Sequence, residues 1–515
     1  MIVSDILPPR LGRKREGLLG AVLVVGGVEL ASSRLTLSIF VLLTAGVILG
    51  MIPLFGLSRR HASAITAGAL TAGILLHAPA HPPARFMVMS LMAAAVFMLP
   101  FVLWPLRRTK MFPLPHMFGL LTAGYLLVGV VFAQPVGTLF LYMNYDMRIR
   151  GAELMVLFGV SLWAGVAMCR IRRLARAKST GPIVPSLLLQ RSLLLLFSSL
   201  GLSAFIGIAG LGARLGALGQ VVNTLSIVGL LGVLAGYFSG GLRRRWLVFV
   251  VLASGVAALS ATSTGRLYAT TVVPLAVVIF VVAIRRRVSW PLVVLVFLLF
   301  VFVNGAKGDY RALTSNSSQA NPVAAALRFP NYVLFDYRPT GPAISSSGAR
   351  FAYSVTDLMG YIDQNVPTKY PRLGLTTYAE LPLTVVPRLL VPFKPDLGFG
   401  NRFGHLYGLL SPDDPYTSEN FPLGVEALAA FGPWGVLFVG VVIGFLFGIV
   451  ARFYSQPSWP DVITGTIITS TLIGGVESQA AISLGPLPLL LLVIPVVARW
   501  LFGGSSDLRG AGGPS

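Results

Sequence analysis

The sequence predicts an all-α polytopic integral membrane protein with about 14 transmembrane helices and one large outer loop that contains short helices. The first reason is composition: the chain is 55% hydrophobic and 11% charged. Globular domains are usually about 45–50% apolar and about 25% charged. The second reason is that apolar stretches of span length recur along the chain, and the third is that basic residues gather in alternate connections between them.

A helix needs roughly 20 mainly apolar residues to cross a bilayer core of about 30 Å. Candidate spans lie near 17–34, 36–55, 62–79, 86–104, 114–133, 152–169, 191–211, 218–239, 245–262, 266–284, 288–305, 433–452, 461–480 and 482–502. Four regions follow: transmembrane helices 1–11 in 1–305, a large extracytoplasmic loop in 306–432, helices 12–14 in 433–502, and a disordered tail in 503–515.

Lys and Arg in short connections predict which end of each span faces the cytoplasm. If the N-terminus is inside, the inner segments carry 24 of these residues and the short outer connections carry 6. The alternation is unbroken, so we expect both termini in the cytoplasm and the 306–432 loop outside. The protein is then a multi-pass membrane protein, in contact with membrane lipids.

The net charge of +22 is explained by these connections. In a soluble chain it would suggest nucleic acid, but here we expect no nucleic-acid partner. The single cysteine, Cys169, excludes an intrachain disulfide and a Cys-rich metal site.

The 306–432 loop is the part of the chain with room for a folded aqueous surface. It holds ten of the chain's 18 carboxylates, and Glu426 is one of them. Phe351, Val355, Leu358 and Ile362 recur at spacings that place them on one face of an amphipathic helix. We expect this helix to lie on the membrane or on the bundle of spans. Closely spaced prolines beyond it predict short, irregular elements.

The outer segment 134–151 mixes aromatic and charged residues, as expected for a segment along the lipid headgroups. Its Arg148 and Arg150 could bind a diphosphate, but interfacial anchoring is the interpretation that the sequence favours.

An outer surface rich in Arg and without a His/Cys cluster suits phosphate-linked substrates, because the guanidinium fork matches phosphate oxygens. The side chains able to take a proton from a sugar hydroxyl are His405, Asp413, Asp414, Glu419 and Glu426. We expect the basic residues around Glu426 to favour its ionised form. Asp413 and Asp414 more often form a turn, and a lone His more often makes a structural hydrogen bond. We expect no metal site, because Asp413 and Asp414 have no third ligand at suitable spacing. We expect no cofactor either.

The loop resembles bacterial Wzy-type oligosaccharide repeat-unit polymerases, which build O-antigen and exopolysaccharide. The residues that carry the resemblance are Thr377-Tyr378, Val386-Pro387-Arg388, Pro392-Phe-Lys394-Pro395, Phe403-Gly404, Tyr407-Gly408, Ser411-Pro412-Asp413, Thr417-Ser418, Pro422, Glu426 and Phe431-Gly432, with Tyr310-Arg311 and, in altered order, Ser263-Thr264-Gly265-Arg266. They cover some sixty loop residues, together with the layout of many spans and one large outer loop before the last few.

The resemblance implies a metal-independent glycosyltransferase that passes a growing chain from its undecaprenyl diphosphate to a new lipid-linked repeat unit. It implies catalytic roles for Glu426, His405 and Arg402, which would orient or deprotonate the acceptor and hold phosphate. The diphosphate would be bound by the basic residues Arg388, Arg266, Lys394 and Arg311. A chain-length regulator and a flippase are the partner proteins that such an enzyme would have.

Two alternatives remain open. An O-antigen ligase-like enzyme uses the same donor and a similar layout with a different acceptor. A lipid-linked oligosaccharide flippase or another transporter should place its polar residues near the bilayer midplane, whereas the polar residues of this sequence gather in the outer loop.

Overall fold

The computed structural model describes residues 83–104, 113–131, 144–169, 184–209, 215, 217–263, 267–285, 303, 306, 310, 328–337, 355–387, 390–391, 399–410, 412–413, 421–454, 458–476 and 478–503. These residues form helices, turns and bends, and none of them forms a β-strand. Two compact units divide the chain, Met1–Pro83 with Val128–Gln134, and Ala84–Leu127 with Pro135–Ser515. The elements below belong to the second unit, except for the last residues of α5.

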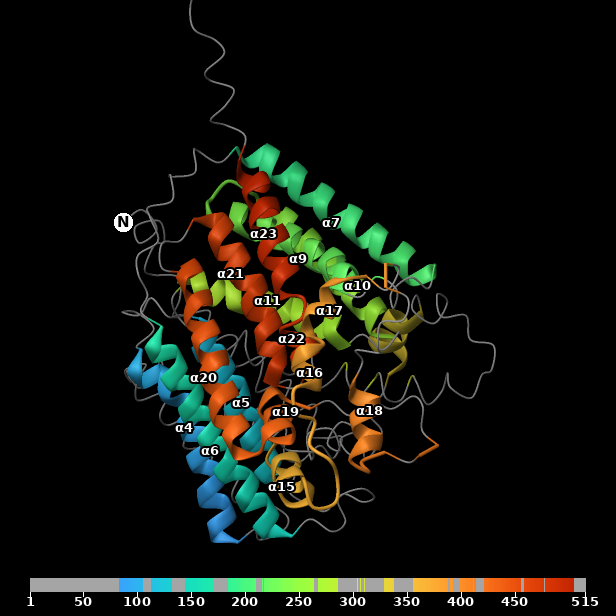
Figure 1. Ribbon diagram of the computed structural model, residues 1–515. Helices are drawn as coiled ribbons and strands as arrows, with labels where there is room; N and C mark the ends of the chain where they lie inside the picture. Colours follow the sequence, from blue (N-terminus) through green and yellow to red (C-terminus); the bar gives the residue numbers. More distant parts are fainter. Residues whose placement is uncertain are drawn as a thin grey trace, which may run out of the picture. The chain divides into compact units, whose positions relative to one another are not determined.

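The long helices are α4 (Ala84–Leu103), α5 (Leu114–Val131), α6 (Tyr145–Met168), α7 (Pro185–Ile208), α9 (Ala217–Phe238), α10 (Arg244–Ser263), α11 (Leu267–Arg285), α20 (Pro433–Val450), α21 (Trp459–Ile473) and α23 (Leu487–Phe502) (Figure 1). Shorter elements are η1 (Tyr332–Asp336), α15 (Val355–Asn365), α16 (Thr376–Ala379), α17 (Leu381–Val385), α18 (Phe399–Leu406), α19 (Leu423–Phe431), η2 (Ala451–Tyr454), η3 (Gly474–Val476) and α22 (Ala480–Ser483).

Within the described residues, six helical stretches are long and apolar enough to cross a membrane. They are Ala84–Leu103, Tyr145–Met168, Pro185–Ile206, Ala217–Phe238, Pro433–Tyr454 and Ala480–Phe502. The all-helical class is therefore confirmed in its coarse form, a helical protein with several membrane-spanning candidates. The predicted spans 17–34, 36–55 and 62–79 lie outside the described residues, as does nearly all of 288–305. The count of fourteen and the side of each loop stay predictions.

Helices α6 and α20 lie side by side along their lengths (Figure 1). Their contact runs along three glycines of α20 spaced four residues apart, Gly440, Gly444 and Gly448. A Cβ on Gly444 would overlap with the carbonyl oxygen of Leu162, and one on Gly165 of α6 would overlap with that of Val441. Small residues at such spacing let two helix backbones approach closely, which is a common way to pack helices in lipid.

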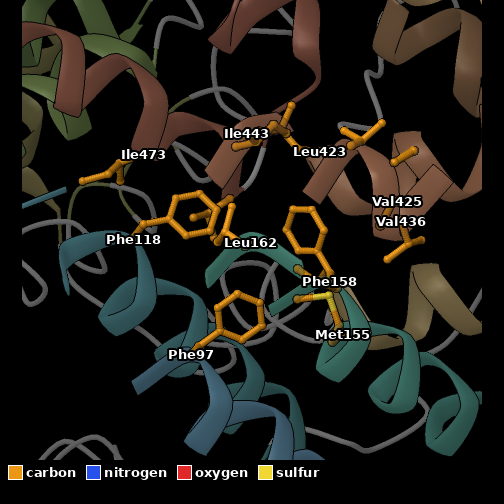
Figure 2. Packing of buried hydrophobic residues seen from close by; sticks show 14 of the residues in the cluster. Phe97, Phe118, Met155, Phe158, Leu162, Leu423, Val425, Val436, Ile443 and Ile473 are labelled. Carbon is orange, nitrogen blue, oxygen red and sulfur yellow. The ribbon is translucent and has the colours of Figure 1, made fainter. Parts of the chain in front are cut away.

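Aromatic side chains fill the space between α4, α5, α6 and α20. Phe97 of α4 lies 6.4 Å from Phe158 of α6, measured between ring centroids, and Phe118 of α5 lies 4.9 Å from Phe447 of α20. Figure 2 shows Phe97, Phe158 and Leu423 within one apolar cluster, to which α19 contributes Leu423. This cluster packs against α19 and so fixes the position of the helix that carries Glu426.

A second apolar cluster joins α7, α9, α10, α11, α21 and α23. Arg191 of α7 donates hydrogen bonds to the backbone carbonyls of Trp500 and Gly503, at the end of α23. These last carbonyls of a helix have no partner within it and carry partial negative charge, so they favour a cation.

Helix ends that carry the predicted cytoplasmic arginines contact one another. Arg285 at the end of α11 lies over the Phe238 ring at the end of α9, 5.5 Å from its centroid. Arg452, after α20, donates to Cys169 Sγ at the end of α6, over 3.9 Å. One set of helix ends is therefore basic, and the opposite ends of α6 and α20 adjoin α15 and α19.

The amphipathic helix predicted around residues 351–362 is confirmed as α15, which buries Val355, Leu358 and Ile362. It packs on α6, where Gly151 and Gly360 bring the two backbones together: a Cβ on Gly360 would overlap with the carbonyl oxygen of Met147. Phe351 lies outside the described residues. The helix thus lies on the bundle, one of the two locations that the sequence allowed.

The predicted headgroup segment is partly wrong, because its second half is the start of α6. Asn144 caps this helix by accepting a hydrogen bond from the Met147 backbone N–H at 2.9 Å. Arg148 forms an ion pair with Asp357 at 3.3 Å, and Arg150 pairs with Asp363 at 2.9 Å. These arginines therefore hold α15 on α6.

Candidate functional site

The strongest candidate site surrounds Glu426, in the first turn of α19. This helix follows Pro422 and ends at Gly432, whose φ of 71° lies in the left-handed region that glycine adopts without steric cost. Residues 423–430 are all buried, and Glu426 is 0% exposed. It is the one charged residue in an otherwise apolar helix, Leu-Gly-Val-Glu-Ala-Leu-Ala-Ala-Phe.

The two carboxyl oxygens of Glu426 have different surroundings. Oε2 accepts a hydrogen bond of 2.7 Å from the backbone N–H of Ala480, the first residue of α22. Oε1 is buried and has no hydrogen-bond partner among the described residues. Leaving a buried polar group unpaired costs about 1–3 kcal/mol, and more for a charged group. The helical break between α21 and α23 thus supplies one partner and leaves a second position open.

Two hydroxyl groups of α16 lie beside this carboxyl group. The Thr377 hydroxyl lowers the pKa of Glu426, so it is close to the carboxylate, although Thr377 Oγ1 makes no hydrogen bond of good geometry. The Tyr378 hydroxyl is also buried without a hydrogen-bond partner among the described residues. Its pKa is raised, first by burial and second by the charge of Glu426. We call Glu426, Thr377, Tyr378 and the Ala480 amide the Glu426 cluster.

Three contacts hold α16 in this place. The Tyr378 ring stacks on Phe431 of α19 with 5.8 Å between centroids. The backbone N–H of Leu373 donates to the Ala429 carbonyl oxygen at 3.1 Å. Both α16 and α17 also pack against α22.

Burial raises the pKa of Glu426 above its ordinary value, and the Ala480 amide and the nearby Thr377 hydroxyl oppose that shift only in part. The sequence suggested the reverse, namely that neighbouring basic residues favour the ionised form. That expectation is wrong because Glu426 is surrounded by apolar side chains, two hydroxyls and one amide, and burial in such surroundings penalises the charged form.

Arg402 and His405 lie on α18, three residues apart. Arg402 is exposed and His405 is half-buried. The helix is held by buried Phe403, which stacks on Phe421 at 5.0 Å between centroids. Tyr361 of α15 also donates to the Tyr407 carbonyl oxygen at 2.8 Å. The contacts that define the Glu426 cluster come from α16, α19 and α22, and α18 contributes none of them.

The four residues expected to bind diphosphate, Arg388, Arg266, Lys394 and Arg311, lie outside the described residues. Asp413 lies in a turn, as expected, and Asp414 is not described. In the part of the chain that the structure describes, no three His, Cys, Asp or Glu side chains gather as a metal site would require.

One described arginine to which the sequence gave no specific role lies at the junction of α19 and α20. The Arg372 guanidinium would be 3.6 Å from a Cβ placed on Gly432, so it lies against the residue just before α20. The sequence also gave no role to Thr377 and Tyr378, although their dipeptide was part of the resemblance. No sequence signal indicated Ala480, because its contribution is a backbone N–H.

The chain matches no known family model, no curated protein and no solved structure. Its family therefore stays a prediction that rests on the residues quoted above.

Proposed function

We propose that this protein is a membrane glycosyltransferase that polymerises undecaprenyl-diphosphate-linked repeat units at the outer face of a bacterial inner membrane. The observation that carries the proposal is the buried Glu426 carboxyl group with one oxygen unpartnered among the described residues. Glu426 lies just before α20, the long apolar helix that begins at Pro433, and therefore at the end of α20 that is opposite its basic end near Arg452. A lipid-linked diphosphate lies at this depth when such a helix spans the bilayer.

In the proposed reaction, Glu426 takes the proton from a hydroxyl of the acceptor sugar. The acceptor oxygen attacks the anomeric carbon of the growing chain, and the bond from that carbon to the lipid diphosphate breaks. The diphosphate leaves with the bonding electron pair, so its negative charge must be stabilised. Arg372 and Arg402 are basic side chains of the described outer elements that we assign to this task, together with the diphosphate-binding residues expected from sequence.

The raised pKa of Glu426 supports its role as a general base. A base works best when its pKa is close to the operating pH, because it then binds the proton more strongly while still being partly ionised. An exposed glutamate, with a pKa of about 4.3, is a weaker proton acceptor. Burial therefore improves the base at the expense of the fraction that is ionised.

Because Glu426 is fully buried, an acceptor can reach it only when a neighbouring segment moves. We assign this movement to α16, which has four residues and is held by the Tyr378 ring, the Leu373 backbone and packing against α22. Short segments of this kind open locally at a lower free energy than long packed helices.

Three of the five buried hydroxyls inside α21 give no support to a transport path; of the other two, Thr469 Oγ1 shares a hydrogen bond with the Tyr454 hydroxyl, and Thr464 Oγ1 has no hydrogen-bond partner among the described residues. Thr466, Ser470 and Thr471 are buried, but each donates its hydroxyl to a carbonyl of its own helix. Such internal bonds are ordinary for Ser and Thr in helices and leave these hydroxyls satisfied.

The test is the substitution Glu426→Gln, which keeps the shape and removes the base. We expect about a 10²–10⁴-fold loss of polymerisation rate and accumulation of single lipid-linked repeat units, measured with purified protein and by lipid-linked oligosaccharide profiles. The acid limb of the wild-type pH–rate profile should lie above about pH 4.3, the ordinary glutamate value, because the base must be ionised and burial raises its pKa.

Glu153→Gln is the matched control, because Glu153 is a partly exposed carboxylate near the start of α6 that pairs with Arg85 and Arg150. It should retain near-normal activity. Normal chain extension by purified Glu426→Gln would exclude the base. If lipid A-core in place of a repeat unit were the acceptor used by the wild type, the protein would be a ligase-like enzyme.

A further inference from the structure

The Glu426 cluster contains three buried polar atoms that lack a hydrogen-bond partner among the described residues: Glu426 Oε1, Thr377 Oγ1 and Tyr378 Oη. They are neighbours, because Thr377 and Tyr378 are adjacent in α16, and this helix packs both on α22, whose Ala480 amide binds Glu426, and on Phe431 of α19 through the Tyr378 ring. Buried polar atoms are nearly always hydrogen-bonded, so a group of unsatisfied ones indicates a missing partner.

The chemistry of the three groups specifies that partner. An ionised carboxylate only accepts hydrogen bonds, whereas each hydroxyl can donate one and accept others. An anion would be repelled by Glu426. A neutral molecule with two neighbouring hydroxyls matches the set, because one hydroxyl can donate to Oε1 while the next exchanges hydrogen bonds with Tyr378 and Thr377.

The position of the Tyr378 hydroxyl is fixed by contacts that do not involve the hydroxyl itself. Its ring lies parallel to Phe431 within 20°. The preceding segment is held by the Leu373–Ala429 backbone bond and by Arg372 against Gly432. Phenylalanine can keep the stacking, so the hydroxyl can be removed without removing the support of α16.

We propose that Tyr378, assisted by Thr377, binds the sugar hydroxyl next to the reacting one and thereby selects which acceptor hydroxyl faces Glu426. This inference rests on the proposed polymerase function and deepens it: Tyr378 is a specificity-determining residue for the linkage formed. When α16 closes over the acceptor, the two hydroxyls reach their ligand positions together with the base.

The experiment compares wild type, Tyr378→Phe and Thr377→Val with purified protein and the lipid-linked oligosaccharide that accumulates in cells lacking this chain. For Tyr378→Phe we expect KM for the acceptor to rise about tenfold, the worth of one hydrogen bond. We also expect linkage analysis of the polymer to find a second linkage beside the wild-type one. Thr377→Val should shift both quantities in the same direction and by less.

Tyr361→Phe is the matched control, because the Tyr361 hydroxyl already donates to the Tyr407 carbonyl and lies outside the cluster. It should leave KM and linkage unchanged. If Tyr378→Phe and Thr377→Val both showed the wild-type KM and formed a single linkage, the inference would be overturned. The proposed function would still stand in that case, provided that the wild-type protein polymerises the repeat unit. If Tyr378→Phe did not accumulate in the membrane, Thr377→Val with unchanged KM and linkage would overturn the inference alone. Absence of polymer from the wild type would instead reject the function.

Discussion

At the residue scale, the start of α6 carries two kinds of ion pair. Arg148 and Asp357 have side chains that are only 7% and 5% exposed. Arg150 and Asp363, two turns further along α15, are 48% and 22% exposed. Water screens the second pair and does not screen the first, so the same residue types contribute very differently.

We predict that Asp357→Asn lowers stability by about 3–5 kcal/mol, because it leaves the Arg148 charge buried without its counter-ion. The readout is thermal unfolding of the detergent-purified protein. Asp363→Asn is the control and should cost about 0.2–1 kcal/mol. Equal effects of the two variants would contradict the distinction drawn from burial.

At the element scale, close helix contacts depend on glycines that have no room for a side chain. Gly444 of α20 lies on the carbonyl oxygen of Leu162 in α6. Gly201 of α7 has nothing within 4 Å of the position that a Cβ would take. Two glycines in apolar helices thus have opposite requirements, which composition and spacing alone do not separate.

We predict that Gly444→Ala destabilises the protein by about 1–3 kcal/mol, because the added methyl forces α6 and α20 apart. Gly201→Ala should be neutral or stabilising by up to about 1 kcal/mol, because alanine is the better helix former. Midpoints of thermal unfolding in detergent measure both changes. A Gly444→Ala protein as stable as the wild type would show that the seam tolerates a wider spacing.

At the scale of the whole molecule, the contacts among helix ends agree with the charge pattern. The starts of α7 and α21 adjoin the ends of α23 and α11 through Arg191 with Trp500 and through Trp459 with Phe280. Elements of the large loop instead adjoin the opposite ends, where Glu426 meets Ala480. Which set of ends faces the cytoplasm is a prediction from the arginines.

Cysteine labelling tests that orientation. Cys169 is the single cysteine and is buried, so a Cys169→Ala background gives little labelling. We predict that a membrane-impermeant maleimide applied to intact cells labels Gln364→Cys in α15 and leaves Ser239→Cys, in the turn after α9, unlabelled until the cells are opened. Both native residues are exposed. The reverse pattern would reject the orientation.

Much of the helical framework could be predicted from sequence. The predicted spans 86–104 and 433–452 agree closely with α4 and with α20 followed by η2, because long apolar runs are a local property. The predicted span 152–169 begins seven residues later than α6, whose first turns contain Asp146, Arg148 and Arg150. These charged residues are typical of a loop in the sequence. A buried helix is favourable there only because Asp357 and Asp363 of α15 form ion pairs with both arginines.

The candidate site divides in the same way. The sequence by itself determined that the chain is helical with apolar helices long enough to span a membrane, that a helix near 351–362 is amphipathic and that Glu426 precedes one of the long apolar helices, since each statement depends on neighbours along the chain. The tertiary structure decided that Glu426 is buried against Ala480, 54 residues away, and beside Thr377 and Tyr378. Burial depends on which distant segments surround a side chain, and this is why the direction of its pKa shift could be obtained only from the folded protein.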